Sequence, residues 1–178
     1  MKRYIVFLLI PLCIAAILPC RLNAVDVVLN DAPAKVFFSP DGGAARGILR
    51  EIGQATREVL VQAYLFTSRP IQSALLKAQK RGINVEVILD KNEQKNSKYI
   101  TAKALRAGGV TVWLDDRHAS AHNKIVIIDR ETVITGSFNF TYAAESKNAE
   151  NVLIIRSQNL AGHYTDNFLN HRRHSRKY

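Results

Sequence analysis

Two apolar runs separated by an amphipathic segment constrain the fold of this chain more than any other feature. VLVQAYLF (59–66) reads as a buried central strand, and INVEVILD (83–90) reads as the next strand. Between them, Ser68 is placed to cap a helix that carries Pro70 in its first turn, and Gly82 is placed to end it. This part of the chain therefore predicts a strand, a helix and a second strand.

The same alternation continues through the rest of the chain. Further strands are expected at 34–39, 110–115, 123–128, 132–136 and 151–156, and further helices at 43–58, at 98–107 and from Ser157 into the C-terminal HRRHSRKY. No linker rich in Pro, Gly or Ser divides residues 25–178, so we expect a single domain there. The expected fold class is α/β, with a mixed β-sheet sandwiched between helices on both faces.

Residues 1–24 differ from the rest. A short basic start is followed by the apolar run YIVFLLIPLCIAAILP, and the segment closes on the small residue Ala24. This layout is typical of a secretory signal peptide cleaved after Ala24, and it predicts a periplasmic or secreted protein with no stable membrane association after cleavage. The alternative is an uncleaved anchor, but Pro11 interrupts the run, which is short for a membrane span.

Cleavage would change both the charge and the cysteine content. The formal net charge of +10 would fall to +7, because Lys2, Arg3 and Arg21 leave with no acidic residue. A basic protein favours an anionic partner such as nucleic acid, an acidic membrane surface or a phosphorylated small molecule. Cys13 and Cys20 would also leave, so the mature chain has no disulfide framework and no cysteine-based zinc site.

The stretch AHNKIVIIDRETVITGSFN (121–139) carries the polar residues that strand packing does not explain. His122 and Lys124 are two residues apart, so in a strand they share a face. Ser137 and Asn139 share parity in the same way, and Gly136 before them permits a close backbone approach. An imidazole, an ammonium, a hydroxyl and an amide are therefore expected to converge.

Such a set suits a phosphodiester substrate. Lys124 can neutralise a phosphate oxygen, while Asn139 and Ser137 can donate hydrogen bonds to it. His122 can serve as nucleophile, base or acid, because an imidazole titrates near neutrality. The stretch contains no cluster of carboxylates or thiols, so we expect no metal ion and no cofactor at this site.

The full pattern, His122-x-Lys124-x4-Asp129-x6-Gly136-Ser137-x-Asn139, resembles the HKD motif of the phospholipase D superfamily. With its size, its expected signal peptide and its single motif, the chain is most similar to the small single-motif bacterial endonucleases of that superfamily, the Nuc type. The resemblance implies that His122 attacks phosphorus and forms a phosphohistidine. It also implies that Lys124, Ser137 and Asn139 hold phosphate oxygens and that Glu150 orients a motif histidine.

The implied mechanism needs a second motif histidine, which protonates the leaving oxygen. Since no second His-x-Lys occurs in the chain, we expect a homodimer in which two motifs face each other. Asp129 belongs to the motif, but its parity is opposite to that of His122, so we expect it to be a turn residue or a structural partner.

Several residues keep a second interpretation. Ser137 can cap a helix begun by FNFTYAAESK, and Glu150 can be an ordinary surface acid. His118 reads as a loop residue, while His163, His171 and His174 are expected to face water on the last helix.

The favoured function is a metal-independent, sequence-nonspecific endonuclease acting on DNA and RNA. The alternative is a phospholipase D-type phosphatidyl hydrolase, for example one that acts on cardiolipin, and it predicts an exposed apolar rim or a retained anchor. A third interpretation, a nucleic-acid-binding module without turnover, is disfavoured by the intact motif.

Overall fold

The computed structural model describes residues 25–92 and 100–178 of the 178-residue chain. The expected signal peptide, residues 1–24, lies outside the described residues. Eight strands form one sheet in the order β1-β7-β6-β5-β2-β3-β4-β8. Their bounds are β1 Ala34–Ser39, β2 Glu58–Ala63, β3 Asn84–Asp90, β4 Thr111–Asp115, β5 Lys124–Ile128, β6 Thr132–Gly136, β7 Glu150–Arg156 and β8 Arg176–Lys177.

The sheet is mixed, as the sequence predicts. Strands β2, β3 and β4 run parallel, whereas β5, β6, β7 and β1 form an antiparallel series that joins the parallel part where β5 pairs with β2. Strand β8 pairs antiparallel with β4 and covers the other edge. β8 was not expected, because a two-residue strand carries no periodic signal of its own.

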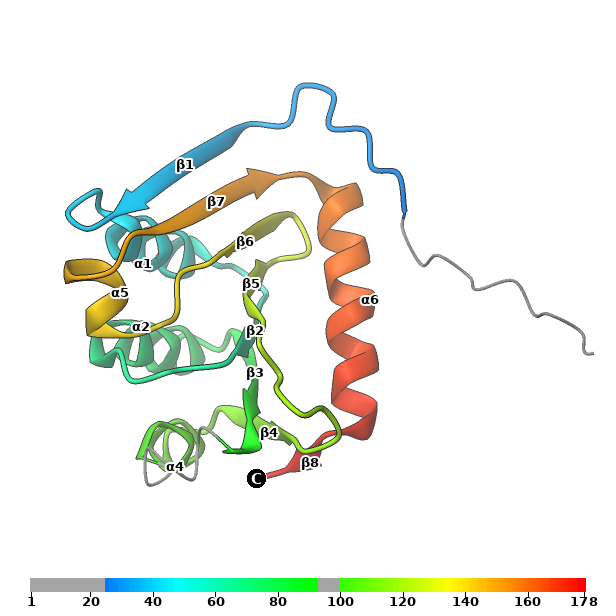
Figure 1. The fold of residues 1–178 in the computed structure, drawn as a ribbon. Helices are drawn as coiled ribbons and strands as arrows, with labels where there is room; N and C mark the ends of the chain where they lie inside the picture. Colours follow the sequence, from blue (N-terminus) through cyan, green and yellow to red (C-terminus); the bar gives the residue numbers. More distant parts are fainter. Residues whose placement is uncertain (1–24, 93–99) are drawn as a thin grey trace, which may run out of the picture.

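Helices cover both faces of the sheet (Figure 1). Buried residues of α1, α2 and α4 pack against one face, and Ala161 and Phe168 of α6 pack against the opposite face. The helix bounds are α1 Ala44–Gln54, α2 Arg69–Lys80, α4 Ile100–Ala107, α5 Tyr142–Ser146 and α6 Gln158–His174. The expected sandwich of helices on both faces is therefore confirmed.

Two of the helix starts follow the caps that the sequence predicts. The Ser68 side chain accepts a hydrogen bond from the Ile71 N–H at the start of α2, and Ser157 accepts one from Leu160 at the start of α6. The short helix α5 is capped by Thr141 rather than Ser137, which leaves the Ser137 hydroxyl for another role.

Asp129 lies in the turn between β5 and β6 and joins this hairpin to the start of β2. Its carboxylate accepts hydrogen bonds from the N–H groups of Thr56, Arg57 and Glu58 at 2.7 to 2.9 Å, and from the Thr56 hydroxyl at 2.8 Å. Asp129 therefore acts as a structural partner in the described structure, in agreement with its parity.

In the parts of the chain that the structure describes, no helix has both the length and the apolar character to cross a membrane.

Candidate active site

The site lies at the carboxyl ends of the parallel strands, where open α/β sheets commonly bind ligands. The connection from β4 to β5 (116–123) crosses this edge. Asp90, the last residue of β3, accepts a hydrogen bond from the Ala121 N–H at 2.8 Å. The Tyr64 N–H, just beyond β2, donates to the Asn123 carbonyl at 3.0 Å. Both contacts hold the connection directly beside His122.

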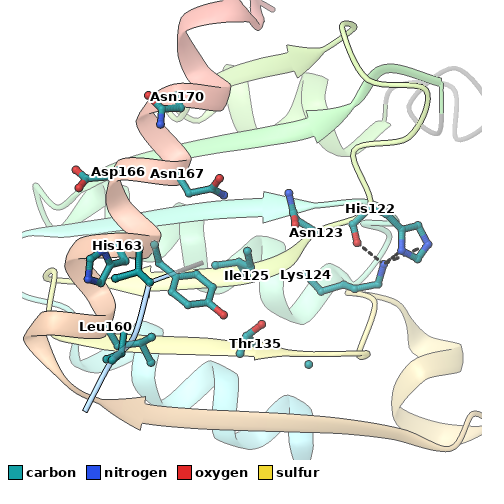
Figure 2. A pocket seen from close by; sticks show the side chains of 14 residues that line it. His122, Asn123, Lys124, Ile125, Thr135, Leu160, His163, Asp166, Asn167 and Asn170 are labelled. Atoms are coloured by element: carbon teal, nitrogen blue, oxygen red, sulfur yellow. Dashed lines mark hydrogen bonds between the residues drawn. The ribbon is translucent and has the colours of Figure 1, made fainter. Parts of the chain in front are cut away.

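His122 and Lys124 are in contact, as their spacing predicts. The Lys124 Nζ lies 2.9 Å from Nδ1 and 3.4 Å from Nε2 of the His122 ring, and it donates to the His122 carbonyl at 2.7 Å (Figure 2). The His122 residue is exposed, whereas Lys124 is only 9% exposed. The imidazole is thus open to a substrate while the ammonium beside it is largely shielded from water.

Tyr64 is a third member of this group, and the sequence analysis missed it. Its ring centroid is 4.2 Å from that of His122, and the Lys124 Nζ lies 5.0 Å from the centre of the tyrosine ring. The ring thus packs against both motif side chains and limits the positions that they can occupy. The only sequence signal was an aromatic residue with a polar group inside the apolar run 59–66.

Burial lowers the pKa of Lys124, and the negative charge of Glu150 partly offsets this shift. The net effect is a pKa below the ordinary lysine value. The electrostatic interaction also places Glu150 close enough to act on the ammonium. The site thus combines one buried cation with one carboxylate that stabilises its charged form.

Ser137 and Glu150 form a second group at the ends of β6 and β7. The Ser137 hydroxyl donates to Glu150 Oε2 at 2.6 Å and accepts from the Asn151 N–H at 3.1 Å. The other Glu150 oxygen accepts from the Asn148 side chain at 3.0 Å. Among the described residues these are the hydrogen-bond partners of Glu150, so within one chain it contacts Ser137 and Asn148 rather than His122.

Asn139 lies in the loop between β6 and α5. This loop is held against the segment after β2, because the Phe140 N–H donates to the Leu65 carbonyl at 3.1 Å and Phe66 pairs with Phe140. The Asn139 Oδ1 is buried and has no hydrogen-bond partner in the described structure. An amide oxygen accepts hydrogen bonds, so only the N–H groups of Asn139 can donate to a phosphate oxygen.

A groove of about 830 Å³ extends from His122 and Lys124 along the face that α6 covers. One side is formed by β5 and β6, with Thr135 and Gly136, and the other by side chains of α6 that include His163 and Asn167 (Figure 2). The histidine and lysine lie at one end of the groove, so a molecule longer than the reacting group has space to continue along it.

Comparisons with known proteins agree with this geometry. Residues 48–172 match the family model described as "Cardiolipin synthase, PLD-like domain". A protein of Rickettsia conorii named "Phospholipase D" is 40% identical over 142 residues, which cover 80% of this chain and 70% of that protein. A "Mitochondrial cardiolipin hydrolase" of Chlamydomonas reinhardtii is 30% identical over 151 residues, which cover 85% of this chain and 66% of that protein.

A solved structure shares the fold over its whole length. Nuc from Salmonella typhimurium, described as a phospholipase D family member, superimposes with a TM-score of 0.78 at 33% sequence identity. The match covers 83% of this chain and 99% of that chain. The chain therefore belongs to the phospholipase D superfamily and is a hydrolytic phosphodiesterase of that superfamily.

Proposed function

We propose that this phosphodiesterase is a metal-independent, sequence-nonspecific endonuclease that cleaves DNA and RNA. The observation that carries the proposal is the contact between the exposed His122 ring and the shielded Lys124 ammonium, 2.9 Å apart, at the end of an open groove. The ammonium places positive charge where a phosphate oxygen lies when the imidazole attacks phosphorus. The formal charge of +10 favours a polyanionic substrate.

The proposed reaction has two steps. In the first, a His122 ring nitrogen forms a bond to phosphorus, the bond from phosphorus to the leaving sugar oxygen breaks, and a second histidine gives that oxygen a proton. In the second, this histidine takes a proton from water, the water oxygen attacks phosphorus, and the bond from phosphorus to His122 breaks. Lys124 and Asn139 bind the phosphate oxygens in both steps, and Ser137 supports them.

The second histidine in this proposal is His122 of a second copy of the chain. A homodimer whose two chains are related by a two-fold axis can bring two identical motifs together, so the second copy of the motif supplies the second histidine. In such a dimer, Glu150 is proposed to orient a motif histidine of the facing site, since within its own chain it contacts Ser137 and Asn148. We further propose export to the periplasm or the medium, followed by no stable association with a membrane.

The second candidate is a phosphatidyl hydrolase, and specific observations favour it. Phe38 on the edge strand β1 is 63% exposed and Tyr142 on α5 is 74% exposed, so apolar side chains reach the surface as a lipid-binding enzyme requires. The names of the Rickettsia and Chlamydomonas relatives point in the same direction. The same attack by His122 cleaves either kind of diester.

One experiment separates the two candidates. The purified protein is incubated in the presence of EDTA with plasmid DNA and, separately, with vesicles that contain cardiolipin. The temperature is kept well below the unfolding temperature of the protein. Cleaved DNA with intact lipid supports the endonuclease, and the reverse supports the phosphatidyl hydrolase. Activity that returns only when Mg²⁺ is added would contradict the metal-independent mechanism, because Mg²⁺ prefers oxygen ligands and acts at phosphates.

The shared site is tested by mixing variants. An excess of His122→Ala chains, refolded or co-expressed with wild type, should reduce activity, because each mixed dimer holds a single motif histidine. An excess of Lys80→Ala chains is the matched control, since Lys80 is an exposed residue at the end of α2. A fully active monomer in solution would exclude the shared site.

A further inference from the structure

A cluster of three histidines and one aspartate lies at the C-terminal end of α6, and the phosphodiesterase site does not use it. The four residues are Asp115, His118, His171 and His174, and one ligand atom from each lies within 4.8 Å of the others. The sequence analysis expected His171 and His174 to face water. That expectation was wrong, because both side chains are mostly buried beside Asp115.

The cluster joins three separate parts of the fold. Asp115 ends β4, and His118 follows it in the connection that leads to His122. His171 and His174 are three residues apart in the last turn of α6, so they lie on one face of that helix. Since Asp115 is 56 residues from His171 in sequence, only the packing of α6 across the sheet brings them together.

Three ring nitrogens surround a single carboxylate oxygen. Asp115 Oδ2 is 2.9 Å from His118 Nδ1, 3.0 Å from His171 Nδ1 and 3.5 Å from His174 Nε2. Ligands bound to one tetrahedral Zn²⁺ at about 2.0–2.1 Å lie about 3.4 Å apart. The three separations from Oδ2 are close to that value, and all four ligand atoms lie within 4.8 Å of one another, so side-chain shifts alone would let them bind one ion.

The other carboxylate oxygen is already held by the backbone. Asp115 Oδ1 accepts hydrogen bonds from the N–H groups of Arg117 and His118 at 3.2 and 3.3 Å. The Asp115 side chain is fully buried, so this arrangement presents Oδ2 to the histidines in a fixed direction. In metal sites, a carboxylate that binds the ion through one oxygen commonly accepts hydrogen bonds at its other oxygen, which fix its orientation.

A buried nitrogen without a hydrogen-bond partner points to a missing ligand. His174 Nε2 is buried, and it forms no hydrogen bond in the described structure although it lies 3.5 Å from Asp115 Oδ2. A purely hydrogen-bonded cluster would leave this nitrogen unsatisfied, at a cost in stability. A metal ion would give its lone pair a partner.

We propose that Asp115, His118, His171 and His174 bind one divalent transition metal ion, with Zn²⁺ as the best fit. Imidazole nitrogens suit Zn²⁺ and its neighbours in the series, whereas Mg²⁺ and Ca²⁺ prefer oxygen ligands. The site is structural, because four protein ligands complete a tetrahedral shell. The ion fastens the end of α6 to β4 and to the connection that carries His122.

The proposal is tested on the full chain, purified without a histidine tag, stripped with a chelator and equilibrated with ZnCl₂. Elemental analysis after buffer exchange should find one zinc per chain in wild type. His163→Ala is the matched control, because His163 is an exposed histidine on the same helix outside the cluster, and His122→Ala is the control for binding at the motif. Both should keep one zinc, whereas His118→Gln and His174→Gln should lose it.

Stability and spectroscopy give independent readouts. Zinc at about 100 times its dissociation constant should raise the Tm of wild type by about 5–10 °C and should leave the Tm of His118→Gln unchanged. If His174→Gln does not fold, His118→Gln decides, because His118 lies in an exposed part of the connection. Co²⁺ bound to wild type should show the intense visible absorption of four-coordinate cobalt.

Three results would overturn the proposal: no zinc retained by wild type, equal retention by the ligand variants, or the weak spectrum of six-coordinate cobalt. These readouts need no substrate, so they stand apart from the outcome of the nuclease and lipid assays.

Discussion

The Lys124 ammonium is held against His122 at two points, 2.9 Å from Nδ1 of the ring and 2.7 Å from the backbone carbonyl oxygen. One contact is to the ring and the other is to the backbone. When the ring rotates toward a substrate, the backbone contact can keep the positive charge beside His122. The Tyr64 ring, 4.2 Å from the imidazole, limits that movement further. The pair is therefore organised before a phosphate arrives, which is how an enzyme avoids reorganisation during the reaction.

His122→Ala should lower kcat on the true substrate by at least about 10³-fold, because the proposed nucleophile is lost. Lys124→Ala should lower it by about 10²–10³-fold, as expected for the loss of one charge-stabilising group. Steady-state kinetics measure both, and circular dichroism checks that the variants fold. Lys80→Ala serves as the control, and near-normal turnover by His122→Ala would contradict the proposed mechanism.

Glu150→Gln should lower the pKa of the Lys124 ammonium. Burial lowers the pKa of Lys124, and the Glu150 charge partly restores it, so removing that charge lowers the pKa further. Lys124 is proposed to hold phosphate as a cation, so the binding of inorganic phosphate should be lost at a lower pH in the variant than in wild type. Titration calorimetry with phosphate at several alkaline pH values measures the shift, because binding does not require the proton that a histidine gives to the leaving oxygen. Glu131→Gln removes an exposed acid in the turn between β5 and β6, and its binding profile should match wild type.

Asp129→Asn should lower the free energy of unfolding by about 2–3 kcal/mol at neutral pH, because a charged acceptor of several backbone N–H groups is lost. Burial alone would raise the pKa of Asp129, but hydrogen bonds from Glu58, Thr56 and Arg57 outweigh it and hold the pKa below its ordinary value.

The stabilisation by Asp129 is therefore complete above the unfolded-state pKa of about 3.9 and disappears as the pH falls through the lower folded-state pKa. Urea unfolding at several pH values should show the gap between wild type and Asp129→Asn closing in acid. Glu131→Gln should stay within about 0.5 kcal/mol of wild type, since its ion pair with Arg57 is exposed. A gap that stays constant down to pH values below 3 would rule out the assigned role of the charge.

Gly136→Ala should impair both stability and turnover. Gly136 has a φ of 152°, and a Cβ there would lie 2.2 Å from the backbone oxygen of Asn151. Backbone cannot move away as a flexible side chain can, so β6 and β7 must shift and Ser137 moves with them. We expect a loss of about 2–4 kcal/mol in thermal or urea unfolding. Gly53→Ala is the control, because its Cβ would meet no atom within 4 Å, and it should be neutral or stabilising.

Most elements could be predicted because their signals are local. The runs 34–39 and 132–136 are strands with the expected bounds, and Ser68 and Ser157 cap helices as expected. The strand expected at 59–66 ends at Ala63, because the Tyr64 N–H donates to the connection that carries His122 and the residues after Tyr64 bind the loop that carries Asn139. The apolar pattern of a segment does not show where its hydrogen-bonded pairing with the adjacent strands ends.

Contacts between distant residues could not be predicted in the same way. The approach of Ser137 to Glu150 depends on the register in which Gly136 pairs with Val152, and no local pattern specifies a register. The environment of Asn139 is a second example, because the burial of its amide oxygen without a partner among the described residues depends on how the loop packs, which no local pattern reports.

From the sequence alone, the pairing of His122 with Lys124 was determined, because residues two apart on an extended chain share a face whatever surrounds them. The superfamily was determined too, since its motif is written within eighteen consecutive residues. Only the tertiary structure decided that Asp129 fastens β2 to a hairpin 71 to 73 residues away, and that three histidines gather around Asp115. Both arrangements depend on how helices and strands pack across one sheet. The free energy of that packing is a sum over contacts between distant segments, so no single segment of the chain specifies it.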